Sequence, residues 1–368
     1  MKLRPFLLER WLPSHKSVYD LSGACVKPLR LNELINELDL DIEVEYGFTK
    51  GDGELRTKIA SLFPHADHDN VLITIGTAEA NFLVLNHLLD RGDEVVTFTP
   101  TYKGSIGVAE AIGVKVTPIP LKPEDGYAVN VEALQELVTR QTRVILITNP
   151  NNPTASKFTP DEVRVICEVA EDVDAYVICD EALRGLELDG SISPSPGAFY
   201  EKCVSTGSLS KLGLPGLRIG WMVAERAVVD TCWSYRDYTT LGIPVLSEHL
   251  AKIALDQLDQ LMNRARRILT DNLQCLRVWV NANREFLHLD PVKAGATAFP
   301  RYRLNVASVA LCDALLRAEG VLLTPGQLFD APRHVRIRYG GVSGDTLKDA
   351  LSRITRFLRD KYMNSHKQ

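Results

Sequence analysis

Residues 143–180 read RVILITNPNNPTASKFTPDEVRVICEVAEDVDAYVICD and place two short apolar runs on either side of a longer helical pattern. The runs at 143–148 and 175–180 are β-branched and almost continuously apolar, as expected of strands covered on both faces. Between them, Thr159 is a helix N-cap, a proline follows in the first turn, and Glu162 completes a capping box. This stretch therefore predicts two parallel strands joined by a helix.

The same alternation extends along the middle of the chain. Further strands are predicted at residues 70–74, 94–98, 115–119, 203–208 and 218–223, with helical patterns between most of them. The fold class is therefore α/β, with a mostly parallel sheet between layers of helices. After Pro244 a long helical stretch leads into a short mixed α/β tail. We expect an N-terminal arm at 1–38 that joins the small domain, a large domain at 39–250 and a small C-terminal domain at 251–368.

The composition restricts the possible partners. The 368 residues carry a net charge of −5, which argues against nucleic acid because phosphate binding needs a basic surface. No apolar run approaches the roughly 18–20 residues that cross a bilayer, and Glu9 and Arg10 interrupt the N-terminal run, so we expect a cytoplasmic protein without membrane contact. The seven cysteines are scattered, and PHADHDN (64–70) has the character of a polar connector, so we expect neither a disulfide framework nor a metal site.

Polar residues follow the predicted strands at the edge where open α/β sheets bind their ligands. Each is of a type that a cofactor site uses, and no glycine-rich dinucleotide motif or P-loop competes for the position. In chain order these residues are Thr77, Tyr102, Asn152, Asp180, Ser208, Lys211 and Arg218, and Ala78 adds a backbone N–H group beside Thr77.

The spacing of four of them carries a family resemblance. Asn152, Asp180, Lys211 and Arg218 follow one another at intervals of 28, 31 and 7 residues. This series resembles the class I and II aminotransferases, which are fold-type I enzymes with a large domain and a smaller α/β C-terminal domain. The resemblance extends from about residue 46 to residue 336 and implies pyridoxal 5′-phosphate as the cofactor, small amino acids and 2-oxo acids as substrates, and a homodimer with shared active sites.

The resemblance assigns roles around the cofactor ring. Lys211 forms the Schiff base with the cofactor and then moves a proton as general base and acid. Asp180 holds the pyridine nitrogen protonated, which keeps the ring an electron sink. Asn152 is expected to donate a hydrogen bond to the phenolic oxygen, and Tyr102 to stack on the ring.

The resemblance also implies a phosphate site. The backbone N–H groups of Thr77 and Ala78 lie at a predicted helix start, which is a natural anion site. Ser208 supplies a hydroxyl group, and Arg218 supplies a guanidinium group suited to bidentate phosphate contacts. Tyr46 resembles the tyrosine that reaches the phosphate of the neighbouring subunit.

The segment HVRIRYG (334–340) resembles the strand that binds the substrate α-carboxylate. We expect Arg336 to be this ligand, although Arg338, two residues on and therefore on the same strand face, is the alternative. Gly23 or Ala24 is expected to offer a backbone N–H to the same carboxylate.

Two positions depart from the family pattern. Leu183 stands where a tyrosine usually donates to the phenolic oxygen of the cofactor, which leaves Asn152 as the main partner. A transaminase tolerates this change, and it also fits members with other chemistry. Ala155 replaces a glycine, and we expect an effect on the local turn alone.

The substrate side chain is left open between several interpretations. Arg236 either reaches an acidic substrate across a dimer interface or is a surface helix arginine. Glu9 and Asp20 either face a basic substrate, because a guanidinium group favours carboxylates, or are solvated or cap the backbone. The segment LERWLPSHKSVYDLSG (8–23) resembles capreomycidine-synthase-like and arginine-processing members of the fold.

The sequence therefore predicts an aminotransferase that passes the amino group of an L-amino acid to a 2-oxo acid through Lys211. The alternative is a cyclase, eliminase or oxidase that acts on an arginine-like amino acid with the same cofactor. A non-catalytic scaffold that only binds an effector is disfavoured, because the lysine is present.

Overall fold

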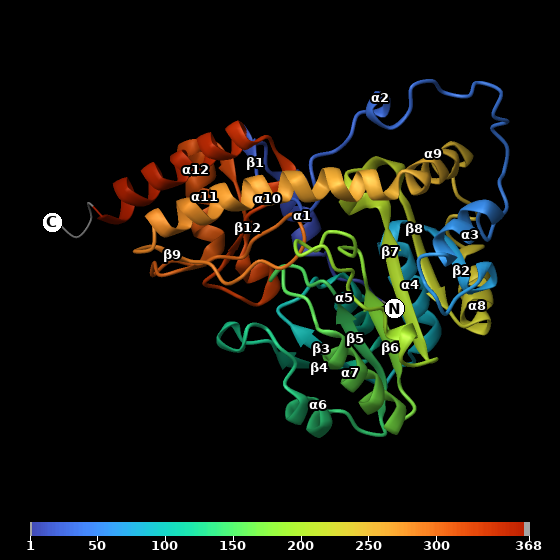
Figure 1. Cartoon of the computed structure of the whole chain (residues 1–368). Coiled ribbons are helices and arrows are strands. Elements are labelled where there is room, and N and C mark those ends of the chain that lie inside the picture. Colours follow the sequence, from blue (N-terminus) through green and yellow to red (C-terminus); the bar gives the residue numbers. More distant parts are fainter. Residues whose placement is uncertain (1, 364–368) are drawn as a thin grey trace.

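The computed structural model describes residues 2–363, and its centre is a seven-stranded sheet (Figure 1). The strand order is β2-β8-β7-β6-β5-β3-β4, and β8 alone runs antiparallel to its neighbours. The strands are β2 (Val71–Ile75), β3 (Glu94–Thr99), β4 (Lys115–Pro120), β5 (Thr142–Thr148), β6 (Tyr176–Asp180), β7 (Cys203–Ser208) and β8 (Ile219–Ala224). All seven predicted strands are confirmed to within one residue at each end, and so is the α/β fold class.

Helices cover both faces of this sheet. Val144 and Leu146 of β5 pack with α4 (Gly76–Leu88), α5 (Gly104–Ile112) and α8 (Arg226–Arg236). Ile145 and Ile147 of the same strand pack with α6 (Val131–Leu137) and α7 (Pro160–Asp172). Successive side chains of a strand point to opposite faces, so a strand buried on both sides needs the continuous apolar run that the sequence contains.

The helix α7 begins as its sequence predicts. Thr159 Oγ1 accepts from the backbone N–H of Glu162 at 3.2 Å, and the Glu162 carboxylate accepts from the backbone N–H of Thr159 at 2.7 Å. This capping box satisfies two N–H groups that have no partner inside the helix.

A second lobe contains the C-terminal elements. Its helices are α11 (Ser308–Glu319) and α12 (Gly344–Leu358), while α10 (Leu258–Ala282) crosses between the two lobes and α9 (Val245–Asp256) packs on α3 (Gly53–Ala60) and β8 of the large lobe (Figure 1). Its short strands are β9 (Leu287–His288), β10 (Arg301–Tyr302), β11 (Val321–Leu322), β12 (Thr324–Pro325) and β13 (Val335–Arg336). The predicted domain limits stay predictions, and their ends at residues 1 and 368 lie outside the described residues.

The N-terminal arm contacts both lobes. Its strand β1 (Tyr19–Asp20) pairs in parallel with β11 of the C-terminal lobe, and α1 (Leu7–Ser14) contacts β12. Beyond α2 (Leu31–Leu34) the chain follows an extended course to α3 (Gly53–Ala60), next to β2 (Figure 1). Segments that are distant in sequence therefore meet where the two lobes join.

No helix within residues 2–363 is both long enough and apolar enough to cross a bilayer. Across the same residues, no three His, Cys, Asp or Glu side chains gather as metal ligands would. In the connector 64–70, the His65 ring packs edge-on against Phe63, and His68 lies 3.5 Å from Asp69. The predicted cytoplasmic location stays a prediction.

Candidate active site

The residues that follow the predicted strands meet at one edge of the sheet. Asp180 ends β6 and Ser208 ends β7, and the next turn, η4 (Leu209–Leu212), carries Lys211. The helix α4 begins at the same edge directly after β2, and Arg218 stands immediately before β8. Since β2, β6 and β7 run in one direction, their carboxyl ends form a common site, as expected for an open α/β sheet.

Asp180 is a buried carboxylate with two N–H donors. Its Oδ1 accepts from the backbone N–H of Ala182 at 3.0 Å, and its Oδ2 accepts from Asn81 Nδ2 at 2.9 Å. Burial raises the pKa of this carboxyl group, while the two donors and the charge of Lys211 oppose the rise. The site therefore has an acceptor prepared for a further N–H group.

Lys211 contacts the N-terminal arm. Its Nζ donates to Cys25 Sγ at 3.7 Å, and its backbone carbonyl accepts from the N–H of Val26 at 3.3 Å. No pattern in the sequence predicts that Cys25 lies beside this lysine, although Cys25 stands only two residues after Gly23. The arm thus forms one wall around the amine.

Arg336 lies against Asn152. Its Nη1 donates to Asn152 Oδ1 at 3.0 Å and its Nη2 donates to the carbonyl of Ser22 at 2.6 Å, while Nε has no partner. Burial lowers the pKa of Arg336 to about 10. Arg338 instead donates to the Asp20 carbonyl at 2.8 Å and pairs with the Asp20 carboxylate at 3.4 Å. Of the two arginines, Arg336 is therefore the one that contacts Asn152, the predicted partner of the cofactor ring.

Gly23 and Asp20 both lie beside Arg338. A Cβ atom on Gly23 would come within 2.9 Å of Arg338 Nη1, so a side chain at position 23 would displace this guanidinium group. The Asp20 carboxylate also accepts from the N–H of Ser22 at 2.9 Å. Asp20 was expected either to face a basic substrate or to be solvated or cap the backbone. The observed contact with the Ser22 N–H is that of a backbone cap.

Tyr102 follows β3 and contacts the arm. Its hydroxyl group donates to Glu9 Oε1 at 3.0 Å, and the Phe6 ring meets the Tyr102 ring edge-on at 5.2 Å. Burial, reinforced by the Glu9 carboxylate, raises the pKa of Tyr102. The negative charge of Glu9 also supports the charged form of Arg336. A carboxylate of α1 therefore belongs to the site.

The start of α4 has the properties of a phosphate site. The hydroxyl group of Thr77 is buried without a hydrogen-bond partner, and the first N–H groups of α4 have no partner inside the helix. A Cβ atom on Gly76 would lie 2.4 Å from Arg218 Nη2, so only glycine lets the guanidinium group come this close. An orphaned hydroxyl, a helix N-terminus and a guanidinium group together fit an anionic phosphate. Ser208, at the end of β7, pairs with Gly220 of β8, where an added Cβ atom would meet the backbone of Gly76 and Thr77.

The two remaining predicted residues lie outside this cluster. The Tyr46 side chain is 88% exposed in the single chain. Arg236 is 0% exposed and donates to the carbonyl of Ile73. Both interpretations of Arg236 are therefore wrong, because α8 packs its last turn against the sheet and the guanidinium group is inside the protein rather than on the surface or in a neighbouring site.

Both departures from the family pattern have a clear structural setting. The Leu183 side chain is buried in the core, and its Cδ1 atom would lie 3.3 Å from a Cβ atom added to Gly295. Being apolar, this side chain offers no hydroxyl group to the site. Ala155 has a φ of 59°, a left-handed conformation that favours glycine. The change at position 155 therefore strains a turn, while the change at position 183 removes a donor.

Asn81 and Thr206 belong to the site and were not predicted. Thr206 Oγ1 donates to Asn81 Oδ1 at 2.8 Å, and Asn81 in turn donates to Asp180. One signal was present in the sequence: Asn81 is an amide among apolar residues of a helix whose neighbours Ala80 and Leu83 are buried. A buried amide needs partners, and here the partner is the central carboxylate.

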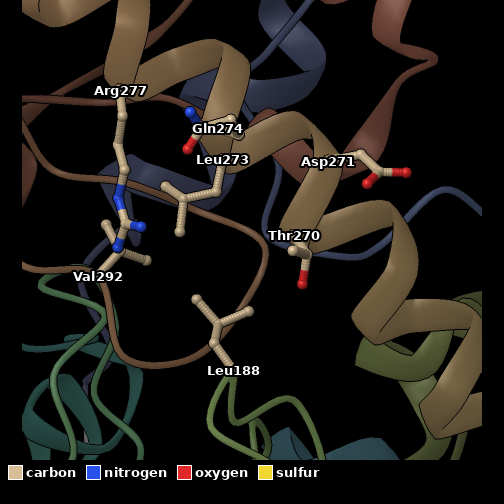
Figure 2. Close-up of a pocket in the computed structure, with 7 residues that line it drawn as sticks. All are labelled: Leu188, Thr270, Asp271, Leu273, Gln274, Arg277 and Val292. Carbon is tan, nitrogen blue, oxygen red and sulfur yellow. The ribbon is translucent and has the colours of Figure 1, made fainter.

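A hollow of about 520 Å³ lies beside α10, away from these residues. Figure 2 shows Arg277 reaching toward Val292 on one side of it, while Asp271 on the same helix points away. None of the predicted site residues lines this hollow. The candidate site lies elsewhere, between the sheet edge and the arm.

Comparison with known proteins identifies the family of the chain. A family model described as aminotransferase class I and II matches residues 24–354. Capreomycidine synthase from Streptomyces vinaceus is 30% identical over 344 residues, which cover 90% of this chain and 88% of that protein. A PLP-dependent aminotransferase from Streptococcus suis superposes with a TM-score of 0.91 at 30% identity, covering 98% of this chain and 99% of the other. The PLP-dependent cyclase OrfR superposes with a TM-score of 0.92 at 29% identity, covering 98% of each chain. The chain therefore belongs to the aminotransferase class I and II family, as the spacing of its motifs predicts.

Proposed function

We propose that this protein is a pyridoxal-phosphate-dependent aminotransferase that passes the amino group of an L-amino acid to a 2-oxo acid. The predicted cofactor is that of the family to which the chain belongs. When bound, this cofactor supplies an electron-withdrawing ring that stabilises negative charge at the substrate Cα. The observation that carries the proposal is the convergence of Lys211, Asp180, Asn152 and Arg336 beside the anion site at the start of α4.

Lys211 is the residue that binds the cofactor and moves the proton. When its amine is free, Lys211 Nζ would accept the proton from the substrate Cα and pass it on within the same half of the transfer, and in the second half it would deliver a proton to the Cα of the acceptor. Asp180 accepts a hydrogen bond from the pyridine N–H, for which its ionised form is required. Since Asn152 Oδ1 already accepts from Arg336, its NH₂ group is left to donate to the phenolic oxygen.

The other predicted residues orient the two ligands. Arg336 binds the α-carboxylate of the substrate, and its unpartnered Nε provides a further donor. Gly23, in the N-terminal arm, offers its backbone N–H to the same α-carboxylate, and Tyr102 packs on the cofactor ring. The phosphate is held by the N–H groups of Thr77 and Ala78, and the Thr77 hydroxyl group, Ser208 and Arg218 supply the remaining contacts.

A second copy of the chain completes the site. Large apolar side chains are exposed along residues 40–48 and near residue 240, namely Leu40, Val44, Tyr46, Phe48, Tyr238 and Leu241. Such a surface is typical of an interface. In a homodimer Tyr46 then reaches the phosphate of the second copy. Sedimentation velocity of the purified protein tests this, and a monomer at micromolar concentration contradicts it.

The reaction is tested by an amino-donor screen with 2-oxoglutarate as the acceptor. Each L-amino acid is supplied in turn, and glutamate and the new 2-oxo acid are both quantified. An aminotransferase forms them in a 1:1 ratio, and the Lys211→Ala variant forms neither. Lys115→Ala, at an exposed lysine of the sheet, is the matched control. A holoenzyme that produces no glutamate from any donor contradicts the proposal.

A second candidate is the cyclisation or elimination of an arginine-like amino acid. Two observations favour it: Glu9 places a carboxylate at Tyr102, and Leu183 leaves the phenolic oxygen without its usual donor. Glu9 then binds a guanidinium group while Arg336 binds the α-carboxylate. The similarity to capreomycidine synthase and to the OrfR cyclase supports this candidate. Arginine and hydroxyarginine are therefore supplied without any 2-oxo acid, and conversion under this condition selects the second candidate over the first.

A further inference from the structure

Three buried polar side chains form a continuous chain behind the cofactor-binding edge. Thr206 of β7 is 0% exposed, Asn81 of α4 is 5% exposed and Asp180 of β6 is 7% exposed. Thr206 Oγ1 donates to Asn81 Oδ1 at 2.8 Å, and Asn81 Nδ2 donates to Asp180 Oδ2 at 2.9 Å. The strand register pairs Asp180 with Thr206, so both side chains point to the sheet face that α4 covers.

The order of donors and acceptors in this chain has a direction. An asparagine amide has an acceptor oxygen on one side and a donor NH₂ on the other, so a half-turn exchanges them. The Thr206 hydroxyl donates to the Asn81 oxygen, which leaves only the NH₂ group to face Asp180. The Cys179 carbonyl also lies within reach of this hydroxyl, but at 3.5 Å it is a poor acceptor. In the reversed amide, Asn81 Oδ1 would face Asp180 Oδ2, and two acceptor oxygens would repel each other.

Several charged or titratable groups interact with Asp180 besides this amide. Lys211 lowers the pKa of Asp180. The negative charge of Asp180 in turn disfavours the negatively charged forms of Tyr102, Glu181 and Cys179. The backbone N–H of Ala182 supplies one donor regardless of side chains, because the backbone fixes it. Asn81 is the side-chain donor, and it is the contact that a reversal can turn from attraction to repulsion.

We propose that Asn81 and Thr206 are positioning residues that hold Asp180 in its ionised form, with Thr206 fixing the amide so that it always donates to this carboxylate. This inference rests on the proposed function, in which the ionised Asp180 accepts from the pyridine N–H. Neither residue touches the reacting atoms. Their effect on the reaction passes through the charge of Asp180.

Substitutions at position 206 separate this role from packing. Thr206→Val keeps the β-branched shape that suits β7 but removes the hydroxyl group, so the amide is free to reverse. Thr206→Ser keeps the hydroxyl group and is the matched control. Asn81→Asp replaces the donor with an acceptor and is expected to shift the titration of Asp180 further than Thr206→Val does. If Asn81→Asp does not fold, Thr206→Val still tests the inference.

The first measurement uses cofactor-free protein. Aspartate labelled with ¹³C at the carboxyl carbon is followed by NMR through an acid titration, and Asp180→Asn identifies the signal. We expect the Asp180 midpoint to move up by about one pH unit in Thr206→Val, because a hydrogen bond to a charged group contributes about that much. The Asp180 midpoint in Thr206→Ser is expected to equal that of the parent protein. An unchanged midpoint in both Thr206→Val and Asn81→Asp overturns the inference.

The second measurement is the affinity for pyridoxal 5′-phosphate between pH 5 and pH 8. Thr206→Val is expected to weaken binding about tenfold, and the acid limb of the affinity profile shifts to higher pH because Asp180 takes up its proton earlier. A loss that is equal at every pH indicates a purely structural role and overturns the inference. If the NMR midpoint moves but the parent protein does not bind the cofactor, the positioning role stands and the proposed function fails.

Discussion

The two sides of the site are built in different ways. On the side where we propose that the cofactor binds (the cofactor side), Asp180, Ser208 and the start of α4 sit at the ends of regular elements of one sheet. On the side where we propose that the substrate binds (the substrate side), Arg336 contacts Ser22 across 314 residues of sequence, and Tyr102 contacts Glu9 across 93. The first side is fixed by the strand order of a rigid sheet, and the second depends on how the arm and the C-terminal lobe meet. We therefore expect changes on the cofactor side to affect every substrate, and changes on the substrate side to discriminate between substrates.

The largest effect is expected at Asp180 on the cofactor side. Asp180→Asn removes the charge that the proposed function needs at the pyridine nitrogen, and kcat/KM should fall about 10²–10³-fold, as when a charge-stabilising contact is lost in other enzymes. The loss should be similar for every amino acid that the enzyme accepts. Asp161→Asn, at an exposed position of α7, is the control. A loss confined to one substrate would contradict the division between the two sides.

On the substrate side, Arg336→Lys is expected to reduce kcat/KM about 10- to 100-fold, mainly through KM. The lysine keeps the charge but loses the planar fork that contacts Asn152 and Ser22. Arg338→Lys is the matched variant, because Arg338 pairs with Asp20 instead. Steady-state kinetics of both variants decide between the two arginines, and an equal loss at position 338 would reverse the assignment.

A stability effect is expected from Glu181, which follows Asp180. Burial raises the pKa of Glu181 to about 7, against the opposing charge of Arg184 3.6 Å away. The folded protein therefore binds a proton that the unfolded chain has lost, so this contribution is complete below about pH 4.5 and disappears as the pH rises through about 7. Glu181→Gln should remove a decline of roughly 2–3 kcal/mol in the free energy of unfolding between pH 5 and pH 8.

Urea unfolding of the cofactor-free protein at several pH values measures this decline. Glu132→Gln, at an exposed position of α6, serves as the control because an exposed side chain should not change the slope. An identical pH dependence in the parent protein and in Glu181→Gln would show that this carboxyl group is ionised in the folded state at low pH.

The smallest effect is expected at Glu9. Glu9→Gln keeps the hydrogen bond from Tyr102 but removes the charge, so KM for arginine should rise about tenfold, while KM for an uncharged amino acid should stay within about twofold. This selective change would sharpen the distinction between the two sides. If KM rises equally for both substrates, Glu9 supports the fold of α1 rather than substrate choice.

The cofactor side could be predicted from the sequence because its residues are tied to the ends of elements. Periodicity and β-branched runs located all seven strands, and polar residues at their ends then marked the site. Asn81 and Thr206 were missed because their role appears only when α4 is laid across β6 and β7. Spacing along one chain does not show which helix covers which strand pair.

The substrate side could be predicted only in part. The choice of Arg336 followed from a resemblance, while the contact of Glu9 with Tyr102 and that of Cys25 with Lys211 depend on the course of the arm. Arg236 was placed wrongly because an arginine in an amphipathic helix is usually exposed, and here the last turn of α8 is packed against the sheet. Irregular segments carry no periodic pattern from which their contacts could be read.

The central claim is that the Nζ atom of Lys211 binds the aldehyde of pyridoxal 5′-phosphate. The most direct test is to treat the purified holoenzyme with borohydride, which fixes an imine irreversibly, and to map the modified peptide by mass spectrometry. We predict a single cofactor adduct on Lys211, with none in the Lys211→Ala variant. An adduct on another lysine, or unmodified Lys211 in protein that carries the cofactor, would contradict the account.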